Sequence, residues 1–155
     1  MNKILVSQCQ AICESDLPAI SNISNILAIL FHEYEDVNWT GLYFYDPKNN
    51  RCVLGPFQGN VACTRIPYGK GVVGTCAEKK ETILVEDVHQ FAGHIACDSA
   101  SNSELVVPLI KDGILYAILD LDSVVTGYFN EDIKETVEEV STLLSDLVST
   151  HKQWI

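Results

Sequence analysis

The segment at residues 87–103, DVHQFAGHIACDSASNS, holds the side chains best suited to chemistry in this chain. It combines two histidines, one cysteine, two acids and several small hydroxyl residues, and an apolar stretch follows it directly. Small neighbours let a ligand approach Cys97 closely, and backbone N–H groups beside it can hold an anion. An accessible thiolate is a nucleophile, whereas a buried thiol is inert. The loop alone leaves catalysis, a structural role and metal binding open for Cys97.

Three acidic residues adjoin this loop along the chain. Glu104 begins the apolar segment 104–110, and Asp120 and Asp122 end the segment 114–122. Alternate residues of a strand point to the same face, so Asp120 and Asp122 lie side by side, and an in-register hairpin brings Glu104 close to both. Such a cluster suits an ammonium group, or a carboxyl that keeps its proton because its neighbours are charged. The alternative is a solvated strand end, although an unpaired acid inside an apolar strand is costly.

The chain has six cysteines, at positions 9, 13, 52, 63, 76 and 97, and none forms a C-x-x-C pair. In a cytosolic protein this number favours buried, redox-active or metal-binding thiols over a structural disulfide framework. Cys9 and Cys13 are spaced like two residues on one helical face, but no second pair of ligands accompanies them. We therefore expect this pair to lie in the core.

Composition and charge narrow the class of protein. The 155 residues are 47% hydrophobic and 20% charged, which is typical of one globular domain, here expected to span 1–155. No apolar run approaches the roughly 20 residues of a membrane span, and the N-terminus lacks a signal-peptide pattern. We expect a cytoplasmic protein that binds no membrane. The net charge of −11 repels a phosphate backbone and argues against nucleic acid as a partner.

The hydrophobic periodicity predicts the elements that must position these residues. Helices are expected at 15–35, 69–80 and 130–152, and strands at 37–45, 51–57, 61–66, 82–86, 104–110 and 114–122. Lys111-Asp112-Gly113 is a strong hairpin signal between the last two strands. The order of elements predicts an α+β fold, with a central antiparallel sheet and the N- and C-terminal helices packed mainly on one face.

Four segments resemble the free methionine-(R)-sulfoxide reductases, a branch of the GAF-domain proteins. They are NWTGLYFY, LGPFQGNVACTRIPYGKGVVGT, VEDVHQFAGHIACDSASNSELVVPL and ILDLDS. The resemblance covers roughly residues 35–129, and its most distinctive parts are the GPFQG-x-x-AC and HIACD stretches. It implies a GAF-like fold with no bound cofactor and no metal.

The resemblance also implies a reaction in which free L-methionine-(R)-sulfoxide is the substrate. Cys97 attacks the sulfoxide sulfur and becomes a sulfenic acid, and Cys63 then condenses with it to form a disulfide. Thioredoxin or a similar dithiol, supplied with electrons by NADPH, reduces that disulfide.

The same resemblance assigns the substrate's groups to parts of the site. Glu104, Asp120 and Asp122 hold the ammonium, and we favour Asp120 as the acid that gives a proton to the departing oxygen. The carboxylate is received by backbone N–H groups around Ile95, Ala96 and Cys97, and the S-methyl group lies against Trp39 and Tyr43. A site that pairs both charged ends rejects methionine within a protein chain.

One position departs from the family pattern. The family usually has a cysteine in the glycine-rich segment, where this chain has Val73, and Cys76 follows three residues later. Cys76 could act as an additional resolving thiol, or it could be a buried small residue, and we favour burial because free cysteine is among the most buried residue types.

Two other functions fit parts of the sequence. A GAF domain could sense a small molecule without catalysis. A zinc site could use His89, His94, Cys97 and Cys63, but the histidine spacing matches no standard pattern, and His89 suits a structural role in the loop better. The apolar stripes of the terminal helices could serve the core or a homodimer interface.

Overall fold

The computed structural model describes residues 1–95, 97, 99–151 and 154–155. Its centre is a six-stranded sheet in which every neighbouring pair is antiparallel, in the order β3-β2-β1-β6-β5-β4. The strands are β1 (Val37–Asp46), β2 (Arg51–Gly59), β3 (Arg65–Pro67), β4 (Ile83–Val85), β5 (Ser103–Lys111) and β6 (Ile114–Ser123).

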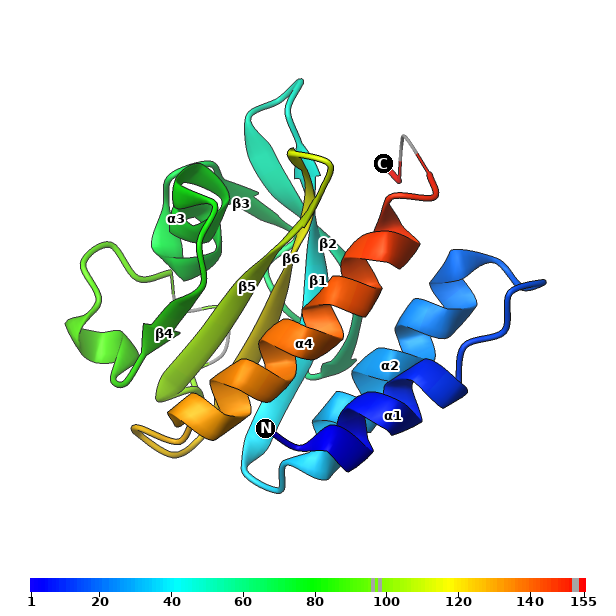
Figure 1. The fold of residues 1–155 in the computed structure, drawn as a ribbon. Coiled ribbons are helices and arrows are strands. Elements are labelled where there is room, and N and C mark those ends of the chain that lie inside the picture. Colours follow the sequence, from blue (N-terminus) through cyan, green and yellow to red (C-terminus); the bar gives the residue numbers. More distant parts are fainter. Residues whose placement is uncertain (96, 98, 152–153) are drawn as a thin grey trace.

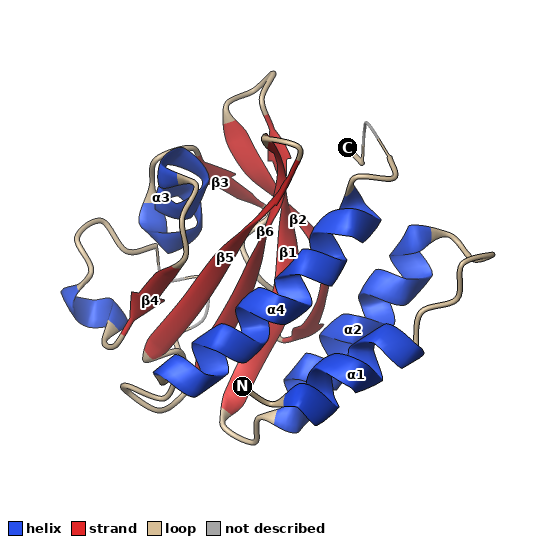
Figure 2. Ribbon diagram, viewed as in Figure 1, coloured by secondary structure: helices blue, strands red, loops and turns tan. Residues whose placement is uncertain are grey.

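The helices divide between the two faces of this sheet. Helices α1 (Lys3–Ala11), α2 (Ala19–Glu33) and α4 (Glu131–Val148) lie together on one face, and α3 (Gly71–Lys79) lies on the other (Figures 1 and 2). A short 3₁₀ helix, η1 (Val88–Gln90), begins the long connection from β4 to β5. The predicted α+β architecture, with the terminal helices on one face, is confirmed.

Alternation along the central strands, interrupted by irregularities in their pairing, assigns the side chains to faces. On β6, Leu119 and Leu121 pack into the core under α1, α2 and α4, while Ile118 belongs to the cluster on the α3 face. Asp120 is two residues beyond Ile118, so its side chain points to the α3 face as well. The sheet therefore separates the apolar core under α1, α2 and α4 from a face that carries acidic side chains.

The β5–β6 hairpin is confirmed at the predicted turn. Asp112 and Gly113 both have positive φ, as the central residues of a type I′ hairpin turn require. The resulting register pairs Glu104 with Asp122 and Val106 with Asp120. The register shifts by one residue between Leu109 and Ile110, so the turn together with this bulge fixes which acids meet near the long loop.

The structure differs from the expected elements in three places. Helix α1 was not expected; the Asn2 side chain caps it by accepting a hydrogen bond from the Leu5 N–H, and Leu5 and Cys9 are buried. Helices α2 and α4 are shorter than the ranges 15–35 and 130–152. The strand expected at 61–66 was wrong over most of its length, because β3 begins only at Arg65 and the preceding residues form a loop.

The apolar stripes of the terminal helices and the pair Cys9 and Cys13 pack into the core on one face of the sheet. The apolar stripes of α2 and α4 face the sheet and form its core, which includes Ile23, Leu27, Val140 and Leu144. Cys9 is fully buried and Cys13 partly so, and the Cys13 thiol donates to the Cys9 carbonyl. Across the described part of the chain, no helix combines the length and apolar character needed to cross a membrane.

Candidate active site

Three carboxylates converge on the α3 face where β5 and β6 meet the long loop. Glu104, Asp120 and Asp122 each place an oxygen so that the three atoms lie within 4.8 Å of one another. Glu104 and Asp120 are only 6% and 5% exposed, and Asp122 is half-buried. One oxygen of Asp120, Oδ1, is buried without a hydrogen-bond partner. The cluster is thus a buried negative site with an acceptor that a cation would satisfy.

Burial and mutual repulsion change the protonation of this cluster. Burial, with the charges of Asp120 and Asp122, raises the pKa of Glu104 well above its usual range. Burial also raises the pKa of Asp120 to about 6, while the hydrogen bond with Glu104 opposes that rise. Two carboxyl groups that share a hydrogen bond titrate as a pair. Near neutral pH the pair therefore retains a proton.

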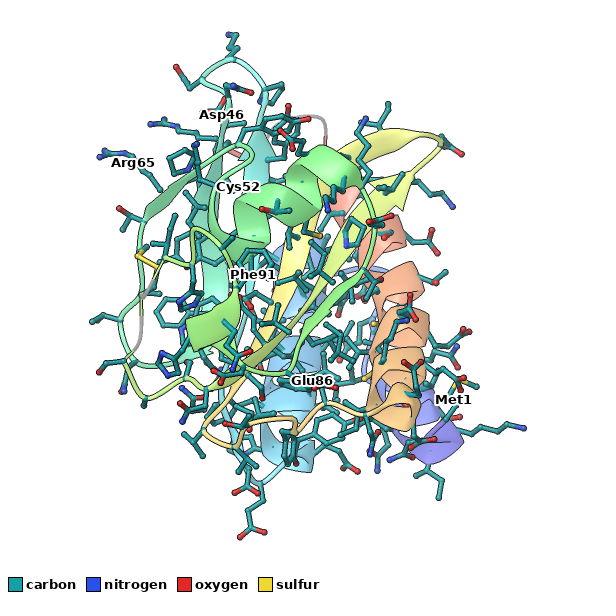
Figure 3. All side chains as sticks on the ribbon, turned by 90° about the vertical axis from the view of Figure 1, so that its left-hand side faces the viewer. Met1, Asp46, Cys52, Arg65, Glu86 and Phe91 are labelled. Carbon is teal, nitrogen blue, oxygen red and sulfur yellow. A yellow bond between two sulfur atoms is a disulfide. The ribbon has the colours of Figure 1, made fainter. Side chains whose placement is uncertain are left out.

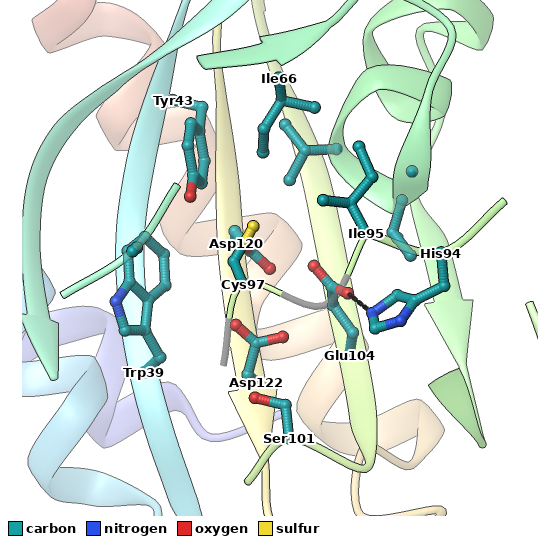
Figure 4. Close-up of a pocket in the computed structure, with 14 residues that line it drawn as sticks. Trp39, Tyr43, Ile66, His94, Ile95, Cys97, Ser101, Glu104, Asp120 and Asp122 are labelled. Carbon is teal, nitrogen blue, oxygen red and sulfur yellow. Dashed lines mark ion pairs between the residues drawn. The ribbon is translucent and has the colours of Figure 1, made fainter. Parts of the chain in front are cut away.

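Cys63 and Cys97 form a disulfide that joins the loop before β3 to the loop before β5. Their Cα atoms are 5.3 Å apart, although 34 positions separate them in the sequence. Cys97 lines the same pocket as the three carboxylates, and Figure 4 shows its sulfur beside Asp120. The structure thus brings together the two thiols and the acids of the predicted site.

Trp39 and Tyr43 form one wall of the pocket from β1. Their rings stack with centroids 5.7 Å apart, and both side chains are almost fully buried (Figure 4). Each also holds the loop that carries Cys63: the Trp39 indole N–H donates to the Asn60 carbonyl at 3.0 Å, and the Tyr43 hydroxyl donates to the Cys63 carbonyl at 3.2 Å. The aromatic wall therefore also positions one of the two thiols.

Two glycines let the walls approach closely. A Cβ on Gly41 would lie 2.5 Å from the indole ring of Trp39. The ring can therefore lie against the strand at this position only because residue 41 is glycine. Gly71 has φ +60°, and a Cβ there would lie 3.1 Å from the Ile95 side chain. Gly71 thus brings the start of α3 against the long loop.

The pocket contains further residues that the sequence did not single out. Its cavity is about 40 Å³ with the disulfide in place, space for water but not for an amino acid. The additional lining residues are Ala62, Ile66, Gly71, Val72 and Ser101. Ser101 accepts a hydrogen bond from the Asn38 side chain at 3.2 Å. All five positions lie in segments that carry the family resemblance, but no residue-level signal marked them as pocket residues.

Val73 and Cys76 both belong to α3 but differ in their position relative to the pocket. Val73, where the family pattern has cysteine, lines the pocket. Cys76 is not among the lining residues; it is fully buried, and its thiol donates to the Glu81 carbonyl at 3.4 Å. Burial raises the pKa of the Cys76 thiol, which keeps it protonated and unreactive. This placement favours a packing role over a resolving one.

The backbone groups expected to hold the carboxylate are only partly described. The Cys97 N–H donates to the Ile95 carbonyl at 3.1 Å, so it is engaged while the disulfide is present. Ile95 lines the pocket. Ala96, which belongs to the same predicted set, lies outside the described residues.

The two histidines of the loop do not join the cysteines in a metal site. Nε2 of His89 bonds with the Asn102 side chain at 3.1 Å, and Asn102 in turn donates to the Val124 carbonyl. Nε2 of His94 lies 3.9 Å from Glu104, and burial lowers the pKa of His94. A neutral His94 leaves the negative charge of the carboxylates uncompensated. Within the described residues, the group suited to hold a cation is the carboxylate cluster itself.

The fold and site define the class of protein. The family model for the GAF domain matches residues 21–149, and the chain belongs to that family. Within it, the chain belongs to the free methionine-R-sulfoxide reductases. It is 39% identical over 140 residues to the Escherichia coli protein of that name, covering 90% of this chain and 84% of the relative. It is 38% identical over 151 residues to the Saccharomyces cerevisiae protein, covering 94% of this chain and 83% of the relative.

A solved structure extends the similarity to the whole fold. The free methionine-R-sulfoxide reductase from Neisseria meningitidis, in complex with its substrate, superimposes with a TM-score of 0.91. The two sequences are 35% identical, and the match covers 99% of this chain and 91% of the other. The family resemblance read from the sequence is confirmed. Members of this family are thiol-based reductases that carry no bound cofactor.

Proposed function

We propose that this chain reduces free L-methionine-(R)-sulfoxide to L-methionine through Cys97 and Cys63. The observation that carries the proposal is the Cys63–Cys97 disulfide, formed at the edge of a buried carboxylate cluster. Membership in the free methionine-R-sulfoxide reductase family supports the choice of substrate.

The charged ends of the amino acid have matching groups in the pocket. The ammonium pairs with Glu104, Asp120 and Asp122, and Asp120 Oδ1 offers a buried acceptor for one of its N–H groups. The carboxylate is received by backbone N–H groups of the loop around Ile95 and Ala96. In the reduced form, release of the disulfide frees the loop to offer the Cys97 N–H as well. The S-methyl group lies against Trp39 and Tyr43.

The first chemical step transfers oxygen from the substrate to Cys97. The Cys97 thiolate attacks the sulfoxide sulfur, the S–O bond breaks, and the oxygen ends on Cys97 as a sulfenic acid while methionine leaves. The proton shared by Glu104 and Asp120 neutralises the departing oxygen. The sequence favours Asp120 as this donor; burial raises the pKa of both Asp120 and Glu104, which supports the pair as the proton source.

The second step forms the disulfide. The Cys63 thiol attacks the sulfenic sulfur of Cys97, and water leaves. A dithiol reductant, thioredoxin supplied by NADPH, then restores both thiols. We place the chain in the cytoplasm, where such a reductant is present, and treat all 155 residues as one domain, because α1 packs on α2 and α4. Homodimer formation through the terminal helices stays a prediction.

The test is thioredoxin-coupled NADPH oxidation with each epimer of free methionine sulfoxide. We expect turnover of the (R) epimer alone, no methionine from Cys97→Ser, and a single turnover without recycling from Cys63→Ser. Thr64→Ser, a neighbouring exposed change, is the matched control and keeps full activity. Binding without turnover in the wild type would instead identify a non-catalytic GAF sensor.

A further inference from the structure

The two sulfurs of the disulfide have different surroundings. Cys97 is part of the pocket lining together with the three carboxylates, whereas Cys63 is not among the described lining residues. Cys63 is carried by the 60–64 loop at the molecular margin, where Figure 3 shows the disulfide. Val61 in this loop is 87% exposed, more than any other exposed large hydrophobic residue of the described chain.

These surroundings make the two sulfurs unequal targets for an external thiolate. With the disulfide formed, the cavity beside Cys97 is about 40 Å³ and admits no protein side chain together with its backbone. The carboxyl cluster beside that cavity also repels a thiolate, because it keeps a net negative charge even when the Glu104–Asp120 pair holds one proton. Cys63 is half-buried and packs against the apolar cluster on the α3 face, but it does not line the acidic cavity, so a thiolate that approaches it is not held beside the three carboxylates.

We propose that the external dithiol attacks the sulfur of Cys63, docks against Val61, and expels Cys97 into the pocket. This inference rests on the proposed function, because that cycle requires the disulfide to be reduced. The reductant's first thiolate bonds to Cys63 Sγ, the Cys63–Cys97 bond breaks, and its electron pair goes to Cys97 Sγ. The reductant's second thiol then displaces Cys63 from the mixed disulfide, leaving the reductant oxidised and both cysteines reduced.

The site contains what this order of events requires. A thiolate leaving beside carboxylates is unstable unless it gains a proton. The Glu104–Asp120 pair retains a proton near neutral pH and lines the same pocket as Cys97. After the S–S bond breaks, the proton passes to Cys97, whereas Cys63 leaves in the second exchange on the outer side.

The loop also presents Val61 in a fixed position. The Trp39 indole N–H holds the Asn60 carbonyl and the Tyr43 hydroxyl holds the Cys63 carbonyl, so Val61 lies between two anchored residues. An exposed valine beside a sulfur that another protein must reach offers an apolar contact at the centre of that encounter.

Trapping of the mixed disulfide tests which sulfur is attacked. The oxidised full-length protein is mixed with a thioredoxin whose second active-site cysteine is replaced by serine, the exchange is stopped with acid, and the remaining free thiols are then blocked with N-ethylmaleimide. Peptide mass spectrometry is expected to find thioredoxin on Cys63 and the maleimide on Cys97. The proposal would be overturned by thioredoxin adducts on Cys97, or by adducts divided equally between the two cysteines. Loss of the disulfide with no thioredoxin adduct on Cys63 would also overturn it. No methionine sulfoxide is present, so the result stands whether or not the chain reduces that substrate.

A second experiment tests Val61. In Val61→Asp we expect the KM for intact thioredoxin to rise about five- to tenfold, with unchanged reduction by dithiothreitol, which needs no docking surface. Ile114→Asp is the matched control, because Ile114 is 54% exposed and begins β6 six residues before Asp120. An unchanged KM in Val61→Asp, or an equal rise in Ile114→Asp, would remove Val61 from the docking surface.

Discussion

The hydroxyl of Tyr43 donates a hydrogen bond to the backbone carbonyl of Cys63 over 3.2 Å. Tyr43 lies on β1, at the centre of the sheet, and Cys63 lies in a loop outside any strand. The bond therefore ties the backbone of Cys63, whose thiol must reach Cys97, to a central strand of the sheet. A residue of the substrate wall thus also sets the position of the second thiol.

Tyr43→Phe is expected to slow formation of the disulfide without slowing the first chemical step. The lost hydrogen bond contributes about 1 kcal/mol, which corresponds to roughly a fivefold slower condensation. Single-turnover experiments that follow methionine release and thiol loss separately measure the two steps. Tyr45→Phe is the control, because Tyr45 lies on the same strand and packs against Tyr68, outside the pocket. Equal slowing of both steps would contradict a positioning role.

Glu104→Gln is expected to weaken binding of the amino group. A hydrogen bond to a charged group contributes about 1.5–3 kcal/mol, so kcat/KM for the free amino acid should fall roughly 10- to 100-fold. N-acetylmethionine sulfoxide lacks the ammonium, and we expect it to be a poor substrate for both proteins with no further loss in the variant. A loss of the same size with both substrates would mean that Glu104 acts only on the oxygen-transfer step.

The raised pKa of Asp120 predicts a pH-dependent stability. The folded protein binds the proton more tightly than the unfolded chain does. The stabilisation is therefore complete below the ordinary pKa of an aspartate and declines as pH rises through about 6. Asp120→Asn should flatten the decline in melting temperature between about pH 4 and about pH 6 and raise the melting temperature at neutral pH. Glu135→Gln, at an exposed site on α4, should follow the wild type.

Cys76→Ala is expected to leave turnover within about twofold of the wild type. The thiol is fully buried and bonded to the Glu81 carbonyl, so its removal should cost about 1 kcal/mol of stability instead of activity. Coupled turnover with thioredoxin and a thermal melt together check this. Loss of recycling at unchanged stability would instead make Cys76 a third redox thiol.

The elements that carry the site were predictable because their signals are local. Alternation assigned Asp120 and Asp122 to one face, and the Asp112-Gly113 turn predicted the hairpin that brings Glu104 near them. The one-residue shift between Leu109 and Ile110, which completes the register, had no sequence signal. The prediction of a strand at 61–66 was wrong over most of its length. The apolar residues there are typical of a strand, but side chains of β1 hold the 60–64 stretch as a loop.

The sequence by itself determined the alternation of the strands, the hairpin that gathers three acids, and the family to which the HIACD and GPFQG motifs belong. Only the tertiary structure decided which cysteine faces the carboxylates, why Cys76 stays apart, and how the acids share a proton. Periodicity is a property of neighbouring residues, so the chain displays it directly. Burial, repulsion between carboxyl groups and access to a sulfur depend on residues far apart in the sequence, and they arise only when the sheet, α3 and the two loops close around one pocket.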